Sequence, residues 1–383
     1  MDLKKIRADF PVATNCRYFQ SAGMSPVPLP VLEKIQNGYC QLSEYGDLHW
    51  HEDAEKQNQM FAVIAGMIGC SAEDIAFAES NSMAMSMVAL SLKQKNKDFN
   101  IVSLEEEFPS NSVPFEYQGI EMKYVPHDQH RYSVESILEQ TTPQTVAVVC
   151  SYVQYSTGFR LDIATLGKRL REKNILFIVN ATQAFPFFLP NMQTMYIDVL
   201  TCSVHKWCFC GHVGTLFVTR PAYREKYPSP VAGWLSVDVS KSNDFIHTAK
   251  NKAFDLWPHA GQYLFASANL KSRLGLGYAI EYLKANNLPE LSEYLLTMSG
   301  YLLKKLSMLP LDIASPANTK EERSGIVSFS LKNENNSELF EYLLAQNIQV
   351  AMRNNLIRAS VNIFTNEEDI DVLCKAVEEY INK

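Results

Sequence analysis

The stretch that decides the fold is Asp198–Val218, which reads DVLTCSVHKWCFCGHVGTLFV. Two short apolar runs, residues 199–202 and 215–218, flank a polar turn that holds Lys206. Such runs are typical of buried strands, so we expect Lys206 at the end of a strand, in the mouth of a sheet. A buried lysine must be ion-paired, deprotonated or covalently bonded, because a free buried ammonium group is costly. Lysines in such settings are the usual partners of carbonyl cofactors, and we predict that Lys206 carries pyridoxal phosphate as a Schiff base.

The composition is that of an ordinary soluble globular protein, with 46% hydrophobic and 20% charged residues. A length of 383 residues predicts a large domain together with a smaller one. The net charge of −7 is spread along the chain without a basic run, which argues against a nucleic acid or membrane partner. The chain shows no apolar stretch of the roughly 18 residues that span a bilayer, and no secretory signal. Eight cysteines in mostly apolar surroundings suit reduced thiols, so a cytoplasmic protein is expected.

Apolar strand candidates alternate with helical stretches through the middle of the chain. Near-continuous Val and Ile runs joined by helices predict a three-layer α/β domain with a mostly parallel sheet. Strands are expected at residues 75–78, 101–104, 146–153, 175–179, 199–203 and 215–218, and a helix at residues 163–173. Because ligands bind at the carboxyl ends of such strands, Phe108 and residues 151–156, 180–183 and 203–206 should meet in one crevice.

The two ends of the chain predict further helices and a second, smaller domain. Helical periodicity covers residues 31–42, 54–68, 83–92, 262–287 and 288–306. The last part predicts strands at 326–331, 348–351 and 358–363, with helices at 337–346 and from 367, which is the pattern of a small α+β domain. We therefore place an N-terminal arm, part of the small domain, at residues 1–20, the large domain at 21–265 and the small domain at 266–383.

Two motifs resemble the class V aminotransferase family of fold-type I pyridoxal phosphate enzymes. They are Asn180-Ala181-Thr182-Gln183 and, one strand later, Ser203-Val204-His205-Lys206-Trp207; the likeness continues through residues 108–115, 153–158 and 358–369. The family includes cysteine desulfurases, selenocysteine lyases, kynureninases and isopenicillin N epimerase-like proteins. The resemblance covers nearly the whole chain. It implies the fold-type I architecture, an amino acid substrate and a homodimer whose active sites are shared between subunits.

The resemblance also implies which side chains hold the cofactor. Lys206 is expected to form the Schiff base and to shuttle the α-proton of the substrate. The phosphate would be bound by Ser203 and His205, helped by Asn81 and Ser82 at a helix N-terminus. A threonine of the family reaches the phosphate of the neighbouring subunit, and Gln262 takes its place here.

The ring and the substrate have their own expected partners. Gln183 would hydrogen-bond the phenolic oxygen of the cofactor, and Phe108 would pack on the pyridine ring where many relatives have a histidine. Arg358 matches the arginine that clamps the substrate carboxylate, for which a planar guanidinium fork is well suited. Loops at residues 47–51, 152–155 and 233–244 are expected to shape the pocket for the substrate side chain.

Asn180 departs from the family pattern, which has an aspartate at this position. A carboxylate keeps the pyridine nitrogen protonated by its charge, whereas an amide can only hydrogen-bond that nitrogen. The cofactor should then be a weaker electron sink, which disfavours transamination and affects elimination of a leaving group less. Loss of activity is one alternative, and a second group that restores the charge is another.

A second departure lies between Arg353 and Arg358, where the chain reads Asn-Asn-Leu-Ile. By the resemblance, desulfurases carry their persulfide-forming cysteine in this loop. We therefore predict a pyridoxal phosphate lyase that cleaves a side-chain bond of an amino acid, in the manner of a C–S lyase, without a loop cysteine. An aminotransferase or an epimerase of the same family is one alternative, and a catalytically degenerate member that binds the cofactor is the other.

His205, Cys208, Cys210 and His212 form a possible metal-binding constellation within one short stretch. A Cys-x-Cys segment in an extended conformation would place both thiols on one face. The second pair of ligands that structural zinc sites normally show is missing from the sequence. We therefore predict no metal, and we expect two apolar cysteines that line a strand.

Overall fold

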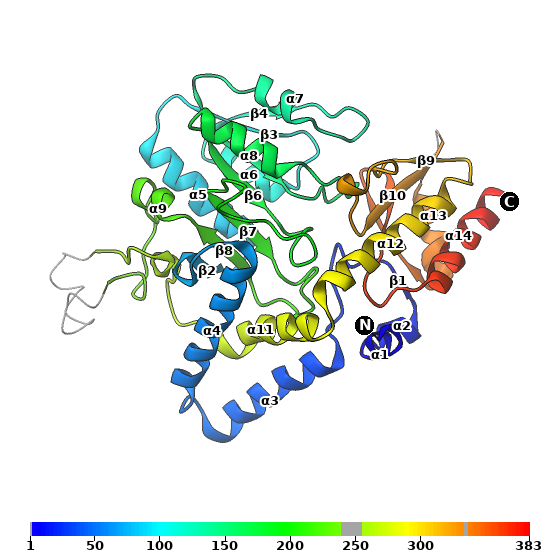
Figure 1. The fold of residues 1–383 in the computed structure, drawn as a ribbon, viewed down its shortest axis with the longest axis horizontal. Coiled ribbons are helices and arrows are strands. Elements are labelled where there is room, and N and C mark those ends of the chain that lie inside the picture. The colour runs from blue at the N-terminus through cyan, green and yellow to red at the C-terminus, as the bar shows by residue number, and fades with distance from the viewer. Residues whose placement is uncertain (1, 239–254, 333–335) are drawn as a thin grey trace.

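The computed structural model describes residues 2–238, 255–332 and 336–383 (Figure 1). Residues 239–244 of the predicted side-chain pocket lie outside this part of the chain. The described residues form a seven-stranded sheet with helices on both faces and, beside it, a four-stranded sheet that carries the C-terminal helices.

The seven-stranded sheet is mostly parallel, as predicted. Its order is β2 (Ile75–Ala78), β8 (Thr215–Thr219), β7 (Val199–Ser203), β6 (Leu176–Asn180), β5 (Thr145–Ser151), β3 (Asn100–Leu104) and β4 (Glu121–Val125). Only β8 forms antiparallel pairs with its neighbours. Sequence analysis did not anticipate β4, because this edge strand leaves most of its side chains partly or fully exposed.

Helices cover both faces of this sheet, which gives the predicted three layers. Ala147, Val149 and Ile178 pack with α5 (Asn81–Lys95), α6 (Val113–Tyr117) and α9 (Pro221–Lys226). Val148, Phe177 and Val179, which alternate with them along the same strands, pack with α7 (Val134–Glu139) and α8 (Ile163–Glu172). Because successive strand side chains point to opposite faces, each buried strand contributes to two cores at once.

Four predicted helix starts are wrong: α3 (Leu29–Tyr45) and α4 (Trp50–Ile68) begin two and four residues before the predicted positions, and polar caps explain the other two. Helix α5 begins at Asn81 instead of residue 83, because the side chain of Ser80 accepts a hydrogen bond from Met83 N (3.2 Å). Helix α11 (Leu270–Ala285) begins eight residues after the predicted position, because Asn269 caps it through Ser272 N (3.1 Å). Helices α3, α4 and α11 pack together along one edge of the molecule (Figure 1).

The smaller sheet is antiparallel, in the order β12 (Ala351–Arg353), β13 (Leu356–Ser360), β10 (Ile326–Leu331) and β9 (Leu311–Ile313). Helices α12 (Leu288–Leu306), α13 (Ser337–Ala345) and α14 (Glu367–Ile381) pack on it around a separate core. The predicted strand at 348–351 is in fact two strands, because Ile348–Gln349 (β11) pairs with Arg17–Tyr18 (β1) and not with the four-stranded sheet. The strand expected at 358–363 is β13, two residues earlier. The N-terminal helices α1 (Leu3–Ala8) and α2 (Val12–Asn15) precede β1.

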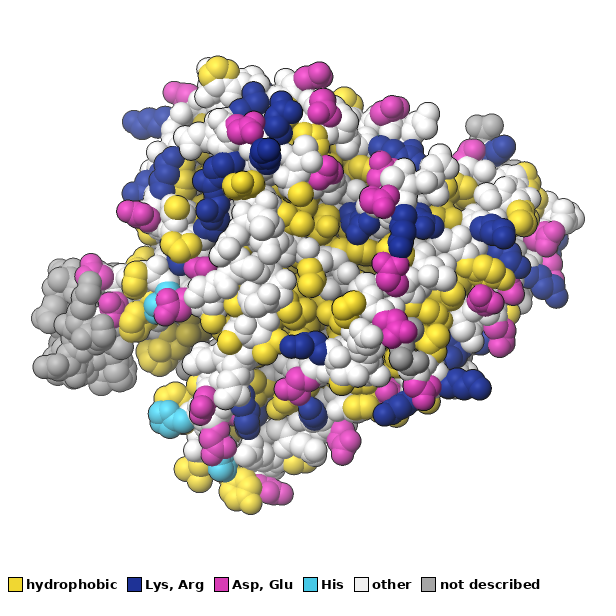
Figure 2. Space-filling view, in the orientation of Figure 1, with side chains coloured by type: hydrophobic (Ala, Val, Ile, Leu, Met, Phe, Trp, Pro, Cys, Tyr) yellow, Lys and Arg dark blue, Asp and Glu magenta, His cyan; other side chains and the backbone are white. Residues whose placement is uncertain are grey.

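Acidic and basic side chains are interspersed over the face shown in Figure 2. None of the described helices combines the length and the apolar character needed to cross a membrane.

A buried ion pair joins the segment before β2 to α9, the helix that follows β8. Arg224 of α9 donates to Asp74, just before β2, at 2.7 Å, and the two side chains are 4% and 9% exposed. Arg224 also donates to the carbonyl oxygens of Thr219 and Pro258. The guanidinium group therefore connects α9, β8 and the segment before β2.

Arg224→Met should lower the free energy of unfolding by about 3 kcal/mol, because it leaves the carboxylate of Asp74 buried without its cation. Urea denaturation measures the loss. Lys34→Met is the control, since Lys34 pairs with Glu281 on the exposed surface and should change stability little. An equal loss in the two variants would contradict the importance given to the buried pair.

Candidate active site

A small pocket, with a volume of about 30 Å³, lies at the carboxyl ends of β3, β5, β6 and β7. Six of the predicted site residues line it together: Asn81, Phe108, Asn180, Gln183, Ser203 and Lys206. Ser110, Ser151, Tyr155 and Thr182 complete the lining. The strand ends thus meet in one crevice, as predicted.

Lys206 follows β7 and is partly exposed to the pocket. Its Nζ lies 5.1 Å from the centre of the Phe108 ring. Burial, and next the positive charge of Arg358, lower the pKa of Lys206 to about 8. Near neutral pH the amine is therefore far more often unprotonated, and more nucleophilic, than an ordinary lysine.

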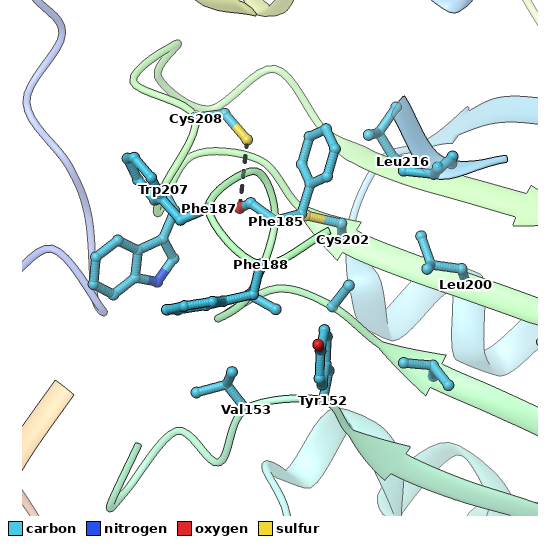
Figure 3. Close-up of a cluster of buried hydrophobic side chains, with 14 of the residues drawn as sticks. Tyr152, Val153, Phe185, Phe187, Phe188, Leu200, Cys202, Trp207, Cys208 and Leu216 are labelled. Atoms are coloured by element: carbon cyan, nitrogen blue, oxygen red, sulfur yellow. Dashed lines mark hydrogen bonds between the residues drawn. The ribbon is translucent and has the colours of Figure 1, made fainter. Parts of the chain in front are cut away.

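The turn that carries Lys206 rests on an aromatic core. Trp207 and Phe187 meet edge to face, and Cys202 and Cys208 lie in the same cluster (Figure 3). Trp207 Nε1 donates to Gln183 Oε1 at 2.6 Å, and Gln183 Nε2 donates to the carbonyl of Ala22 at 3.0 Å. These bonds orient the Gln183 amide and leave one of its two N–H groups available to the pocket.

Asn180 ends β6 and is held from two sides. Its Oδ1 accepts from the backbone N–H of Thr182, and its Nδ2 donates to Asn111 Oδ1, both at 3.0 Å. The hydroxyl of Thr182 in turn accepts from Ser203 N at 2.9 Å. Because a backbone N–H can only donate, the amide orientation of Asn180 is determined by its neighbours.

Asn111 connects Asn180 to Glu107, a buried carboxylate that sequence analysis did not identify. Glu107 Oε2 accepts from Asn111 Nδ2 (2.7 Å) and from the hydroxyl of Ser151 (2.6 Å). Its Oε1 accepts from Ser151 N (2.6 Å) and Gln154 Nε2 (3.0 Å). Burial raises the pKa of Glu107, and these hydrogen bonds oppose the shift. The sequence did offer one indication of a role for Glu107: it follows the strand predicted at 101–104, and ligands bind at the carboxyl ends of such strands.

The two residues expected at the start of α5 are placed differently. Asn81 is buried and donates to Ser110 Oγ at 2.6 Å, while its Oδ1 has no hydrogen-bond partner among the described residues. Ser82 is exposed and does not line the pocket.

Arg358 lies on β13, is 2% exposed and reaches the edge of the site. Its Nη1 donates to the carbonyl of Tyr155, a pocket residue, at 2.8 Å, and its Nε has no partner among the described residues. Burial, and next the charge of Arg353, lower the pKa of Arg358 to about 10, so it remains a cation at neutral pH. A buried guanidinium group with an unused donor is ready to receive an anion.

His205 and Gln262 do not line the pocket. The ring of His205 lies 4.2 Å from that of His212, and burial, His212 and Lys206 lower the pKa of His205 to about 4. Gln262 accepts from Ser229 N (2.6 Å) and donates to the carbonyl of Trp257 (3.3 Å). Its amide therefore stabilises a loop within the same chain.

Cys208 and Cys210 are both buried, and burial raises the pKa of each thiol. Cys208 Sγ donates to the carbonyl of Phe185 (3.9 Å; Figure 3), and Cys210 Sγ donates to that of Val204 (3.6 Å). Both cysteines are buried as predicted, but they lie in the turn after β7 and not on a strand.

Glu106, His127 and His130 are the one group in the described chain whose possible metal ligands lie within 4.8 Å of one another. The backbone N–H of His130 donates to His127 Nδ1 at 3.1 Å. The proton of a neutral His127 ring must then be on Nε2, which faces Glu106 at 3.8 Å. His130 Nδ1 lies 2.9 Å from Glu106 Oε2, so the three side chains form a polar cluster outside the pocket.

Residues 17–373 match the family Aminotransferase class-V. The chain belongs to this family. Curated relatives at low identity span nearly the same length: a probable cysteine desulfurase of Streptomyces coelicolor is 23% identical, with 100% of this chain and 98% of the relative covered. A probable cysteine desulfurase of Pyrococcus abyssi is 20% identical, with 98% and 97% covered.

Solved structures confirm the fold. The apo structure of a cysteine desulfurase from Thermococcus onnurineus superposes with a TM-score of 0.89 at 19% identity, covering 99% of this chain and 98% of that one. The cystine C–S lyase C-DES, in complex with its reaction product cysteine persulfide, gives a TM-score of 0.84 at 18% identity, covering 96% and 99%. At these identities the likeness establishes the fold-type I architecture and nothing finer about the reaction.

The pocket residues fit pyridoxal phosphate. Lys206 offers an amine with a lowered pKa, and Phe108 offers an aromatic face beside it. Gln183 keeps a free N–H group, and Asn81 keeps a buried oxygen without a partner among the described residues. These are the groups needed to hold an aldehyde, an aromatic ring and polar ring substituents.

Arg358→Gln should raise the pKa of Lys206 above 8, because it removes the positive charge that most opposes protonation of the amine. Competitive acylation of the cofactor-free protein across a pH series, with the Lys206 peptide quantified by mass spectrometry, measures this pKa. Arg353→Gln should raise it less, since Arg353 has a smaller effect on Lys206. An unchanged midpoint in Arg358→Gln would refute the electrostatic coupling.

Proposed function

We propose that this chain is a pyridoxal phosphate-dependent lyase that cleaves a side-chain bond, of the C–S type, in an amino acid with a free α-carboxylate. The observation that carries the proposal is the Lys206 amine, with a pKa of about 8, between Phe108 and the Asn180–Gln183 segment in a class V chain. The names of the relatives, which include cysteine desulfurases and a cystine C–S lyase, favour sulfur-containing substrates.

Each pocket residue has a task in this proposal. Lys206 holds the cofactor aldehyde, Phe108 covers the ring face, and Gln183 donates its remaining N–H to the phenolic oxygen. Asn180 faces the ring nitrogen, while Ser203 and Asn81, at the N-terminus of α5, bind the phosphate. His205 and Ser82 do not line the pocket, so their predicted contacts with the phosphate would require both side chains to move. When bound, pyridoxal phosphate supplies an aldehyde for the amino group and a ring that accepts electron density from the substrate α-carbon.

Arg358 binds the substrate carboxylate in this arrangement. Its buried guanidinium group already uses Nη1 on Tyr155, which orients the fork, and its Nε has no partner among the described residues. A carboxylate would satisfy that donor and compensate the buried charge.

Lys206 then moves the proton of the substrate α-carbon, and the bond between the β-carbon and its leaving group breaks. The sulfur leaves as a thiol, sulfide or persulfide, and water converts the remaining three-carbon fragment to pyruvate and ammonia. Asn354 and Asn355 form a tight turn between β12 and β13, with φ of 50° and 59°. Since this hairpin holds no cysteine, we propose that the sulfur is released rather than stored on it.

The same proposal includes a cytoplasmic homodimer, with the phosphate of one subunit near Gln262 of the other. The internal bonds of Gln262 would have to open for that contact. The division into an N-terminal arm at residues 1–20, a large domain at 21–265 and a small domain at 266–383 likewise remains a prediction. The boundary helix α11 packs on α3 and α4 of the large unit.

Purified protein loaded with pyridoxal phosphate should show a visible absorption band that borohydride abolishes. Peptide mapping should find the reduced adduct on Lys206, because this lysine is the nucleophile of the pocket. With cysteine or cystine the protein should release pyruvate, ammonia and sulfide or persulfide in matching amounts.

Lys206→Ala is the control for both measurements, since it removes the amine and leaves the fold. A protein that takes up no cofactor would refute the proposal. Formation of a keto acid together with transfer of the amino group to an acceptor would identify an aminotransferase instead, and racemised substrate without pyruvate would identify an epimerase.

Arg358→Ala should raise KM for the best amino acid substrate about 100-fold, because a charge-assisted fork to a carboxylate contributes roughly 2–3 kcal/mol. Arg358→Lys keeps the charge without the fork and should lie between wild type and Arg358→Ala. Arg169→Ala, on the exposed side of α8, is the control for a lost surface arginine. If the cofactor band is retained and KM is unchanged in Arg358→Ala, the carboxylate is bound elsewhere.

A further inference from the structure

Glu107 is a buried carboxylate whose charge is not balanced by an ion pair among the described residues. All four of its described hydrogen bonds come from neutral donors, on Ser151, Gln154 and Asn111. In the described part of the chain no lysine, arginine or histidine forms an ion pair with it, and none is among the main causes of its pKa shift, which is upward because of burial. Three of the four partners are N–H groups, which can only donate, so an ionised carboxylate would satisfy every one of these bonds.

One of these bonds starts a chain of amides that ends in the pocket. Asn111 donates to Glu107, Asn180 donates to Asn111, and the backbone N–H of Thr182 donates to Asn180 Oδ1. All the hydrogen bonds of the chain point toward Glu107. Asn180 is its last side chain, and it lines the pocket with Lys206.

We propose that Glu107 is a positioning residue for the cofactor: through Asn111 and Asn180 it transmits the negative charge that the family aspartate supplies directly. The inference rests on the proposed binding of pyridoxal phosphate. An amide that donates to an anion gains electron density on its own oxygen, and a second amide donating to that oxygen is polarised in the same sense. Asn180 Oδ1, with one lone pair unused, is thereby a stronger acceptor for a protonated ring nitrogen than an isolated amide oxygen.

The direction of these hydrogen bonds fits the donor and acceptor atoms that residues 107, 111 and 180 offer. A carboxylate at position 180 could not donate to Asn111 Oδ1, so Asn111 would have to turn its amide and lose its bond to Glu107. With asparagine at 180 and glutamate at 107, Asn111 can therefore form hydrogen bonds to both side chains at once.

The test is the protonation state of the ring nitrogen in the holoenzyme, measured by ¹⁵N NMR with pyridoxal phosphate labelled at that atom. In the wild type we expect a protonated nitrogen at neutral pH, in spite of Asn180. Glu107→Gln removes the charge at nearly constant size. It should make the nitrogen at least about tenfold easier to deprotonate, which is one pKa unit. The resonance then moves toward the unprotonated position, and the visible band changes with it.

Glu106→Gln is the matched control, because the same substitution one residue earlier affects a carboxylate that contacts His130 and not the amide chain. It should leave the ring nitrogen as in the wild type. A purely structural role for Glu107 would lower stability or cofactor affinity without changing the protonation of the bound ring.

A double variant that reverses the hydrogen bonds between these side chains should restore the protonated ring nitrogen. In the double variant Glu107→Gln/Asn180→Asp, Asn111 can turn its amide, donate to the new carboxylate at position 180 and accept from the new amide at position 107. The two side-chain bonds are then kept in the opposite direction, and the backbone N–H of Thr182 still donates to the side chain at position 180. We expect this double variant to recover a protonated ring nitrogen, with the carboxylate now beside the ring.

The outcomes separate the two proposals. An unprotonated ring nitrogen in the wild type overturns the inference without any variant, so poor folding of Glu107→Gln does not prevent the test. A nitrogen that stays equally protonated in folded Glu107→Gln overturns it as well. In both cases labelling of Lys206 by borohydride still supports the proposed function, whereas failure of the wild type to bind the cofactor refutes that function first.

Discussion

The parallel pairing of β5, β6 and β7 is the constraint on which the site depends. Its register sets Ser151 beside Asn180 and Asn180 beside Thr201, so that β5 and β6 end together and β7 ends two residues later, at Ser203. The hairpin to antiparallel β8 then turns the chain back and leaves Lys206 at the same edge. A slip of one residue would point each of these polar side chains to the other face of the sheet. The apolar alternation that fills the two cores therefore also determines which side chains meet in the pocket.

The charges around this pocket are arranged asymmetrically. Lys206 and Arg358 are positive charges at the pocket, and Arg353 adds a third that both of them experience. Glu107 is connected to the pocket through Asn111 and Asn180. An anionic ligand with a polar ring would be attracted by the first group and oriented by the second. The depressed pKa of Lys206 is a consequence of the same arrangement, because the neighbouring cations and burial both disfavour its ammonium form.

Much of this could be predicted from the sequence, for physical reasons that differ between elements. Strands Val199–Ser203 and Ile326–Leu331 and helix Leu288–Leu306 have the predicted bounds, since each is an apolar pattern with clear breaks. The edge strand β4 lacks such a pattern. The start of α11 could not be predicted, because the helical periodicity of the sequence begins before Asn269, the residue that caps the helix. Lys206, Gln183 and Asn180 could be placed because they follow strands. Glu107 and Asn111 could not, because their meeting depends on how the chain turns after β3, and their roles, like those of the other site residues, remain proposals.

The direction of an amide chain is a property that no single residue reveals. An asparagine at position 180, taken alone, indicates a weakened cofactor site, since it lacks the charge of the family carboxylate. The same asparagine joined to Asn111 and Glu107 completes a path that ends on an anion, with every donor and acceptor in agreement. A buried carboxylate is costly unless its charge is used or compensated, and here the neutral donors around it compensate only part of that cost. A cation at the far end of the amide chain would compensate the rest. In this proposal the negative charge of the family aspartate is not lost: it lies on Glu107, which is connected to the ring nitrogen through two amide side chains.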